Sequence, residues 1–445
     1  MNPFVAVWDF VRLVWHRRYH SKKRIRSYQL RQIKKLFAHA TTHSPFYRQL
    51  YQGHVIHSWD DVHNLPTIDK QTMMEHFSEL NTVGLNKDDV ISYAVQKERD
   101  KDFYGYYQDQ YVIGLSSGTS GNKGIYITPK AMTKRLPAVF LARSGLPLSA
   151  LPYRILFLLR VFSQGFDDIN APLVSLKYLS TMEPLDEIVT AINDNRINIL
   201  MAPPSLLRQL ITKADEITVS LKRIVTYAEV LYPDDKQRFE SIFATKVIEI
   251  YQASEGQIAS ACKEGHLHIN EDLVYIELFD EEGNRIDTPH VKGHRMVLTN
   301  LVNVAQPLIR YEMNDMIVLD EPCPCGSKFR RIEHVLGRHD DLLYFMDQNG
   351  QTRYIFPDLF VRWIIVSSEA IREFQVRQRT VGSVEITIDM MGEDERIIPT
   401  LTSKIKQELQ AFDIIESELE IALAPIKLPV DKNKFKRFIN EIDKQ

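Results

Sequence analysis

Between residues 154 and 251, short apolar runs alternate with segments whose apolar residues recur at helical spacing. The apolar runs predict buried strands at 154–159, 174–179, 197–201, 221–227 and 246–251. The segments between them predict helices at 184–194, 205–211 and 233–243, the second of them capped by Ser205. Short apolar strands separated by helices are typical of a mainly parallel sheet covered on both faces, where ligands gather at the carboxyl ends of strands. We therefore predict an α/β domain.

Beyond residue 255 the pattern changes to strict alternation of apolar and polar residues. Residues 273–279 and 294–301 predict antiparallel strands with glycine turns beside them. Farther along, strands predicted at 374–379, 384–389 and 419–424 accompany a helix that carries Leu401, Ile405 and Leu409. These elements predict a second, compact α+β unit. A tight turn with basic and acidic residues, Gly337 to Asp341, precedes it and is a candidate hinge between the two units.

The N-terminal 35 residues are the exception in an otherwise evenly charged chain of 445 residues with formal net charge −3. An apolar segment at 4–15 precedes nine Lys and Arg between His16 and Lys35, with no acidic residue among them. The segment is too short to span a bilayer and lacks the features of a signal peptide, so we expect a cytoplasmic protein. Two hypotheses stay open: residues 4–35 lie on an anionic membrane surface, or they pack on their own domain. The overall charge indicates no nucleic-acid partner.

A loop rich in hydroxyls and glycines lies between two strand-like segments that end near residue 115 and begin near residue 125. It contains Ser116, Ser117, Gly118, Thr119, Ser120, Gly121 and Lys123. Backbone N–H groups, hydroxyls and an ammonium in one loop can converge on phosphate oxygens. The spacing matches neither the Walker A loop nor the dinucleotide fingerprint, both of which open a helix. An ordinary glycine-serine hairpin and a mobile loop that grasps a triphosphate are the two interpretations.

Two further loops with carboxylates leave predicted strand ends, at Glu229 and at Glu255. Such a carboxylate can bind Mg²⁺ through oxygen, or it can simply face solvent. The three cysteines, at positions 262, 323 and 325, exclude a disulfide framework and suit a reducing compartment.

Taken in order, five motifs resemble the adenylate-forming superfamily, in its phenylacetate-CoA ligase and coenzyme F390 synthetase branch. They are SSGTSGNKG at 116–124, YQASE at 251–255, PLIRYEMND at 307–315, GRHDD at 337–341 and LPVDKNKFKR at 428–437. The resemblance implies a large N-terminal α/β domain, residues 1–336, and a small C-terminal α+β domain, residues 337–445. The small domain is expected to swing about Asp340 between two half-reactions.

The implied activity is ATP-dependent adenylation of a carboxylic acid with release of pyrophosphate, followed by acyl transfer to an acceptor, by default CoA. Two anions meet when a carboxylate attacks the α-phosphate, so the site must supply positive charge. By resemblance, Lys434 reaches the substrate carboxylate and the α-phosphate, with Lys432 and Lys436 as rivals two residues away. Glu255 ligates Mg²⁺, and Thr119 completes the catalytic set.

The same resemblance places the nucleotide. Ser117, Thr119 and Lys123 hold the β- and γ-phosphates, Tyr251 flanks the adenine, and Asp315 binds the ribose hydroxyls. The other residues implied at the nucleotide are Ser116, Gly118, Ser120, Gly121, Glu229, Ser254 and Arg338.

The cysteines also resemble a feature of this branch. Cys262 and His268, together with Cys323 and Cys325, resemble a structural zinc site with four N/S ligands. Buried free thiols are the alternative, and His266 is the rival of His268.

The chain departs from the family after the hinge, where residues 342–360 lack the Arg-Gly pair of the CoA ligases. The acceptor therefore stays open among CoA, another thiol, a hydroxyl and an amine. Two further alternatives are an F390-type transfer of AMP to a hydroxyl and a non-catalytic protein that binds nucleotide or membrane. Glu312 replaces a basic residue of the family, and Tyr227 stands where a glycine is usual. The identity of the acid and the oligomeric state, a homodimer among the options, are not determined by the sequence.

Overall fold

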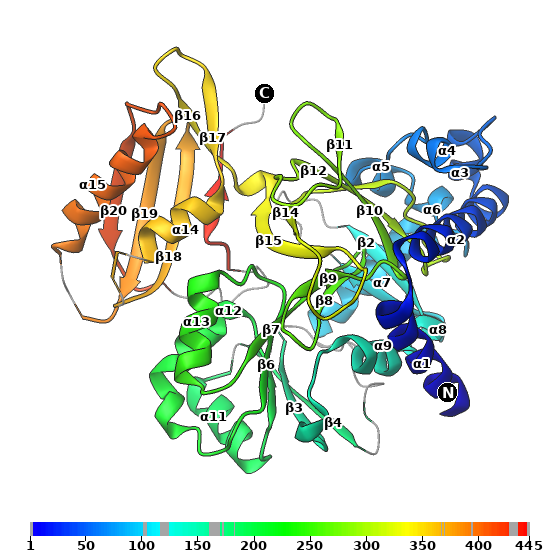
Figure 1. Ribbon diagram of the computed structural model, residues 1–445, viewed down its shortest axis with the longest axis horizontal. Coiled ribbons are helices and arrows are strands. Elements are labelled where there is room, and N and C mark those ends of the chain that lie inside the picture. Colours follow the sequence, from blue (N-terminus) through cyan, green and yellow to red (C-terminus); the bar gives the residue numbers. More distant parts are fainter. Residues whose placement is uncertain are drawn as a thin grey trace.

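The structure is a computed structural model that describes residues 3–100, 105–115, 124–159, 170, 173–181, 183–365, 367–368, 370–392, 395–426 and 435–442. Figure 1 shows the elements after residue 343 gathered on one side and all earlier elements on the other. Each group has a hydrophobic core of its own, and the core of the later group draws its fully buried residues from 343–438. The predicted α/β fold with a smaller α+β unit is confirmed.

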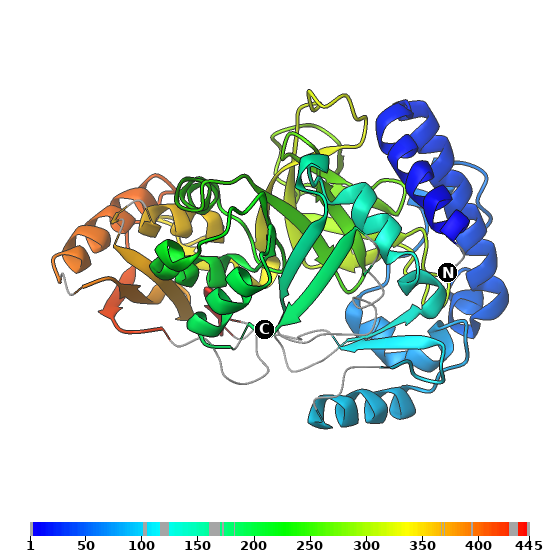
Figure 2. The same ribbon diagram turned by 90° about the horizontal axis from the view of Figure 1, so that it is seen from below.

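Seven helices precede the first strand. They are α1 (Pro3–Tyr19), α2 (Lys22–His43), α3 (Pro45–Leu50), α4 (Trp59–His63), α5 (Lys70–Glu75), α6 (Phe77–Leu80) and α7 (Lys87–Asp100). Ser21 caps α2 by accepting a hydrogen bond from the Arg24 N–H, and Asp69 caps α5 in the same way from Thr72. Figure 2 shows α1 and α2 at the end of the molecule opposite the small unit.

An antiparallel pair holds both ends of the hydroxyl-rich loop. β1 (Tyr111–Leu115) and β2 (Ile125–Pro129) pair from Tyr111 opposite Pro129 to Leu115 opposite Ile125. The prediction that the loop joins two strands rather than opening a helix is confirmed. Two short helices follow, α8 (Lys130–Thr133) and α9 (Leu136–Arg143), and then the 3-10 turn η1 (Leu148–Ala150).

The central sheet has nine strands in the order β14-β15-β9-β8-β7-β6-β5-β3-β4. Its parallel half consists of β3 (Tyr153–Leu158), β4 (Val174–Leu179), β5 (Ile199–Met201), β6 (Arg223–Thr226) and β7 (Val247–Ala253). Its antiparallel half consists of β8 (Gly256–Ala261), β9 (Leu267–Ile269), β14 (Asp315–Asp320) and β15 (Arg331–Arg338). All five strands predicted in the first half are present. The sheet as a whole is mixed, because every partner added beyond β7 runs antiparallel.

The helices of the α/β region cover the two faces of the parallel half. One face packs on α11 (Leu185–Asp194), α12 (Pro204–Leu210), η2 (Ile211–Glu216) and α13 (Pro233–Ile242), and the opposite face packs on Leu136 and Phe140 of α9. Ser205 does not cap α12 as predicted. The helix begins one residue earlier because Pro204 occupies its first turn, where the fixed φ of proline suits a helix start.

A second sheet, in the order β11-β10-β12-β13, lies between the central sheet and the N-terminal helices. Its strands are β10 (Val274–Phe279), β11 (Arg285–Ile286), β12 (Arg295–Asn300) and β13 (Tyr311–Met313). The antiparallel pairing predicted for the stretches near 273–279 and 294–301 is confirmed. Gly293 is required here because a Cβ at this position would lie 2.8 Å from the Ile317 carbonyl oxygen.

The small unit follows the 3-10 turn η3 (His339–Asp341). It contains β16 (Leu343–Met346), β17 (Thr352–Ile355), α14 (Pro357–Ile365), β18 (Ile371–Thr380), β19 (Ser383–Met390), α15 (Ile397–Gln410), β20 (Glu418–Leu423) and β21 (Phe438–Asn440). Its sheet has the order β20-β19-β18-β21, and Leu401, Ile405 and Leu409 of α15 are fully buried against it.

Four buried charges lie where the small unit meets α12 and α13, and we call them the seam quartet. Arg208 of α12 pairs with Asp235 of α13 at 2.7 Å and with Glu373 of β18 at 2.8 Å. Arg437 pairs with Glu373 at 2.6 Å. Burial opposes ionisation of Glu373, but the two guanidinium groups outweigh it and lower the pKa of the carboxyl.

Candidate active site

Strand ends from both halves of the central sheet meet at one corner, which we call the acidic corner. Tyr251 lies on β7, Glu255 lies in the turn from β7 to β8, and Asp315 begins β14. Arg338 ends β15 directly opposite Asp315, and its Nε lies 3.5 Å from Asp315 Oδ1. The structure therefore gathers four of the residues that the sequence resemblance implied, although they are spread over almost ninety positions of the chain.

Glu255 is held by groups from the strand that leaves the hydroxyl-rich loop. Tyr126, the second residue of β2, donates a hydrogen bond of 2.6 Å from Oη to Glu255 Oε1. The Tyr311 hydroxyl lies 3.3 Å from that of Tyr126, and Asn300 Nδ2 donates to the Glu255 backbone oxygen at 2.7 Å. Burial raises the pKa of the Glu255 carboxyl above its ordinary value. The acidic corner is thus tied directly to the strand that holds the loop.

Tyr251 carries an unsatisfied polar atom. Its hydroxyl is buried beside Asp315 and makes no hydrogen bond of normal geometry within the described residues. Burial, and then the Asp315 charge, raise the pKa of this phenol well above its ordinary value. Buried polar atoms normally have partners, and an exception at a strand end calls for a ligand or water.

Lys70 is a site residue that sequence reasoning missed. It begins α5, and the charges that act on its ammonium belong to Glu255, Arg338 and Asp340. Burial lowers its pKa, an effect that Glu255 opposes. The segment before Lys70 is anchored to β13 and the residue before it. The Ile68 N–H donates to the Arg310 oxygen, and the Ile68 carbonyl oxygen accepts from the Glu312 N–H at 2.8 Å. A lone lysine in a six-residue helix offers no pattern, so only the fold reveals its place.

Glu312, which replaces a basic residue of the resembled family, has partners within its own surroundings. Its carboxylate accepts a hydrogen bond of 2.6 Å from Thr67 Oγ1 and lies 3.3 Å from Arg295. The substitution is therefore accommodated by the extended segment that leads to Lys70.

Glu229 follows β6 and contacts the first turn of α12. Its carboxylate accepts hydrogen bonds from the Ser205 N–H at 2.9 Å and from Ser205 Oγ at 2.7 Å, and so it closes the first turn of α12. This contact explains why Ser205 is buried inside the helix rather than capping it. Tyr227, two residues earlier, is also buried and donates to the Leu158 carbonyl oxygen. Ser254 is exposed in the turn beside Glu255.

The remaining predicted residues lie outside the described parts of the chain. They are Ser116, Ser117, Gly118, Thr119, Ser120, Gly121, Lys123 and Lys434, together with the rival Lys432. The other rival, Lys436, is described. Burial lowers its pKa, while the nearby Asp341 opposes that shift.

The candidate hinge is hydrogen-bonded to both units. Asp340 accepts a hydrogen bond from Asn314 Nδ2, and the His339 N–H donates to the Asn314 oxygen at 2.8 Å. From the small unit, Asn440 Nδ2 donates to the Leu342 oxygen at 2.7 Å. Burial raises the pKa of Asp341 to about 6. The turn therefore lies between the acidic corner and the last strand of the small unit.

The cysteines gather in a second place, on the antiparallel half of the central sheet. One ligand atom each of Cys262, His268, Cys323 and Cys325 lies within 4.8 Å of the others. His268 Nδ1 lies 3.0 Å from the Phe329 oxygen and can donate to it, which leaves Nε2, 3.6 Å from Cys325 Sγ, as an acceptor. His266 Nδ1 lies 3.2 Å from Cys323 Sγ, so the rival histidine is also adjacent. Two thiols and an imidazole nitrogen with a fixed tautomer suit tetrahedral Zn²⁺, and the third thiol completes the set.

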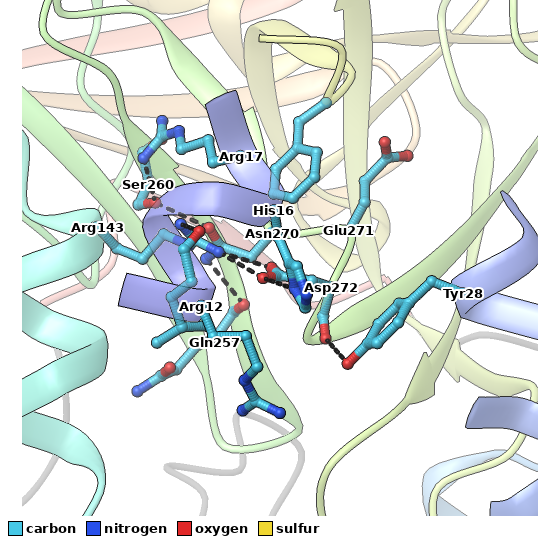
Figure 3. A network of polar contacts seen from close by, with 12 residues as sticks. Arg12, His16, Arg17, Tyr28, Arg143, Gln257, Ser260, Asn270, Glu271 and Asp272 are labelled. Carbon is cyan, nitrogen blue, oxygen red and sulfur yellow. Dashed lines mark hydrogen bonds and ion pairs between the residues drawn. The ribbon is translucent and has the colours of Figure 1, made fainter. Parts of the chain in front are cut away.

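A buried polar network, drawn in Figure 3, joins the N-terminal helices to the sheets. At its centre is Asp272, whose carboxylate accepts hydrogen bonds from Arg143 Nη2 at 2.6 and 2.8 Å and from His16 Nδ1 at 3.1 Å. Arg17 of α1 donates to the Ser260 oxygen at 2.9 Å. Burial opposes ionisation of Asp272, but Arg143 and His16 outweigh it, so that its pKa is lowered.

Comparison with proteins of known sequence gives one curated relative at significant similarity. It is the phenylacetate-coenzyme A ligase of Thermus thermophilus, 23% identical over 418 residues, which cover 89% of this chain and 87% of that one. No family model matches the chain.

Solved structures match over nearly the full length. A 2-hydroxyisobutyryl-CoA ligase in its postadenylation state, in complex with R3-HIB-AMP, superposes with a TM-score of 0.72 at 15% identity. The alignment covers 97% of this chain and 92% of that one. The chain has the adenylate-forming ligase fold. Together with the relative from Thermus, this confirms the resemblance to the phenylacetate-CoA ligase-like branch.

The same ligase with 2-HIB-AMP and CoA in its thioesterification state superposes on this adenylate-forming fold with a TM-score of only 0.59, at 16% identity over 96% and 92% of the two chains. The share of each chain covered is nearly equal in the two comparisons.

Proposed function

We propose that this chain activates a carboxylic acid by ATP-dependent adenylation, releases pyrophosphate, and transfers the acyl group to an acceptor, by default the thiol of CoA. One observation supports this most. The strand that follows the hydroxyl-rich loop provides Tyr126, which holds Glu255 at the same corner as Tyr251, Asp315 and Arg338. Phosphate-binding backbone, a carboxylate for a metal and groups for a nucleoside thus belong to one site.

Within this proposal Glu255 ligates Mg²⁺ bound to the phosphates of ATP. Its raised pKa reflects a buried carboxylate with no nearby cation strong enough to offset burial, and a divalent ion would supply that charge. Tyr251 flanks the adenine, Asp315 accepts from the ribose hydroxyls, and Arg338 orients Asp315. Lys434 reaches the site from the small unit, and Thr119 and Lys123 hold the distal phosphates. Lys70 adds positive charge on the opposite side of Glu255.

We further infer a domain boundary after Arg338, two residues beyond the one predicted between 336 and 337, because Gly337 and Arg338 still belong to β15; the small domain rotates about Asp340. The separate core of the small unit and the short η3 turn support it. Rotation of the small unit would change which of its residues face the acidic corner.

ATP/pyrophosphate exchange measured across aryl, fatty and amino acids tests the proposal. We expect exchange that depends on one class of acid and is reduced about a thousandfold in Lys434→Ala, as the loss of one unit charge near the reacting phosphate predicts. Lys432→Ala serves as the matched control. Consumption of CoA with thioester formation identifies the acceptor. AMP attached covalently to a hydroxyl product, without dependence on an acid, would instead establish the F390-type reaction and contradict the proposal.

The cysteine cluster is proposed as a structural Zn²⁺ site. Its support is the convergence of four ligand atoms from three separated segments. Elemental analysis of protein purified without chelators should find about one zinc per chain. His268→Ala should lose it, whereas His266→Ala should retain it. The opposite result would assign the imidazole ligand to His266, and protein without zinc would remove the claim.

A further inference from the structure

Helix α1 buries most of its polar side and exposes most of its apolar side. Its buried side carries Asp9, His16 and Arg17 together with Leu13, all between 1 and 9% exposed. Its solvent side carries large apolar residues on successive turns: Val7, Trp8, Val11 and Trp15, which are 61, 68, 48 and 53% exposed. A surface helix of a globular protein normally shows the reverse arrangement.

The polar groups on the buried side fix this orientation. Asp9 accepts hydrogen bonds from Arg135 Nε at 2.7 Å, His16 donates to Asp272, and Arg17 binds the Ser260 oxygen. Rotating α1 to hide its tryptophans would leave these charges unpaired in the interior. The apolar face is therefore a stable feature of the surface, and contiguous exposed apolar residues on one helix indicate a partner.

Basic groups adjoin this face. Arg18 continues it, and α2 begins at once with Lys22, Lys23 and Arg24. A shallow pocket of about 570 Å³ at this junction is lined by Lys23, Arg24 and Arg31, with the Ser21 and Ser27 side chains beside them. Among the described residues, no carboxylate forms an ion pair with Arg18, Lys22 or Lys23. Figure 2 shows that α1 and α2 form one outer edge of the molecule.

We propose that α1 and the start of α2 bind the surface of an anionic phospholipid bilayer. Trp8, Val11 and Trp15 enter the boundary between headgroups and acyl chains, where tryptophan is favoured. Lys22, Lys23, Arg24 and Arg31 bind lipid phosphates, and the shallow pocket accepts a headgroup.

Charge decides between this partner and a second copy of the chain. A two-fold interface would place the same basic groups of both copies side by side, with nothing to neutralise them. Among the described residues no helix is long and apolar enough to cross a membrane, so the contact is with the surface.

Vesicle flotation with the full chain tests the inference. Wild-type protein should float with vesicles of phosphatidylcholine containing about one third phosphatidylglycerol and not with pure phosphatidylcholine, and binding should weaken in high salt. Trp8→Ser combined with Val11→Ser should lower the partition coefficient at least about tenfold, because both residues leave the apolar phase. The control Val55→Ser removes an apolar residue from a different part of the surface, and its exposure of 61% lies between those of Val11 and Trp8.

Charge reversal provides the second arm. Lys22→Glu with Lys23→Glu should abolish flotation, whereas Lys404→Glu with Lys406→Glu on α15 changes net charge equally and should not. All variants should keep wild-type ATP/pyrophosphate exchange and melting temperature, since none of the substituted residues is buried. Absence of flotation by wild-type protein, or equal flotation on neutral vesicles, overturns the proposal. A wild-type dimer that Trp8→Ser with Val11→Ser converts to monomer would replace the bilayer by a second copy.

Discussion

Two acidic groups in the same domain show opposite behaviour. Glu255, in the acidic corner, is half-buried and has a raised pKa, and its carboxylate accepts a hydrogen bond from the Tyr126 hydroxyl. Asp272, in the network of Figure 3, has a lowered pKa and two hydrogen bonds from one arginine. Burial opposes ionisation of both carboxyl groups, so burial alone does not distinguish them. What differs is whether the protein itself supplies the compensating charge.

This difference distinguishes the acidic corner, a candidate functional site, from the network around Asp272, which is structural. The network around Asp272 pairs its carboxylate with Arg143 and His16, and it fastens α1, α2 and α9 to the sheets. The acidic corner keeps a protonatable carboxyl and the unsatisfied Tyr251 hydroxyl, both of which a magnesium-bound nucleotide could satisfy. Perturbed groups whose compensation is missing are stronger candidates for function than perturbed groups that are fully paired.

The largest effect should come from removing the uncompensated carboxylate. Glu255→Ala should reduce magnesium-dependent turnover at least about a thousandfold, since a unit charge at ~4 Å and an effective dielectric of ~20 contributes roughly 4 kcal/mol. The melting temperature should stay within about 2 °C of wild type, because no ion pair is lost. Steady-state kinetics and thermal unfolding measure both, with Glu420→Ala on β20 as control. Near-normal turnover would remove Glu255 from the proposed chemistry.

Breaking the network around Asp272 should affect stability instead. Arg143→Met leaves Asp272 buried without its main partner and should lower the free energy of unfolding by about 3 kcal/mol or more. Turnover per folded molecule should change less than about twofold. Denaturant unfolding gives the first quantity. Arg372→Met, which breaks a half-exposed pair with Asp389, should cost at most about 1 kcal/mol. A comparable loss in both variants would contradict the contrast.

A matched pair of phenol deletions sharpens the comparison on a smaller scale. Tyr126→Phe removes the hydrogen bond to Glu255 and should lower kcat about tenfold, the value of one hydrogen bond to a charged group. Tyr28→Phe removes a bond of 3.3 Å to the Asp272 backbone oxygen and should leave kcat unchanged. Equal effects on kcat would mean that the two networks are not functionally distinct.

The smallest effects should appear as opposite pH dependences. The folded chain binds the Glu255 proton more tightly than the unfolded chain does, so this carboxyl destabilises the fold increasingly as pH rises above about 4.3. Asp272 contributes stability above about pH 3.9 and loses it as pH falls through its lowered pKa. Relative to wild type, Glu255→Gln should become progressively more stable as pH rises from 4 to 7. The deficit of Asp272→Asn should shrink in acid. Unfolding curves across pH 3.5–8 measure both slopes.

Much of the fold was predictable because buried strands and helices leave characteristic patterns of apolar residues in the local sequence. Each strand of the parallel half is an apolar run between helical segments, and the hairpin around residues 116–124 is bounded by β-branched residues. The order of the strands, and the change to antiparallel pairing after β7, depend on contacts between distant segments that periodicity does not encode.

The candidate site was predictable only where a motif marks it. Glu255, Asp315 and Arg338 lie in motifs and do meet. Lys70 lies in none, and its position depends on the pairing of Ile68 with β13. Glu229 was implied at the nucleotide, but its hydrogen bonds go to Ser205, a contact that requires α12 to start at Pro204. The orientation of α1 also escaped prediction, because Asp272, far along the chain, determines which face is buried.

The seam quartet has a consequence for how fast the enzyme can work. Arg208 and Asp235 belong to the large unit, whereas Glu373 and Arg437 belong to the small one. Rotation about Asp340 would separate Arg208 from Glu373 and Arg437 from Asp235, and so expose these four charges to solvent. Dissolved ions stabilise separated charges more than paired ones, so the domain movement should be sensitive to the electrolyte around it. The turnover rate should therefore depend on the salt concentration of the medium.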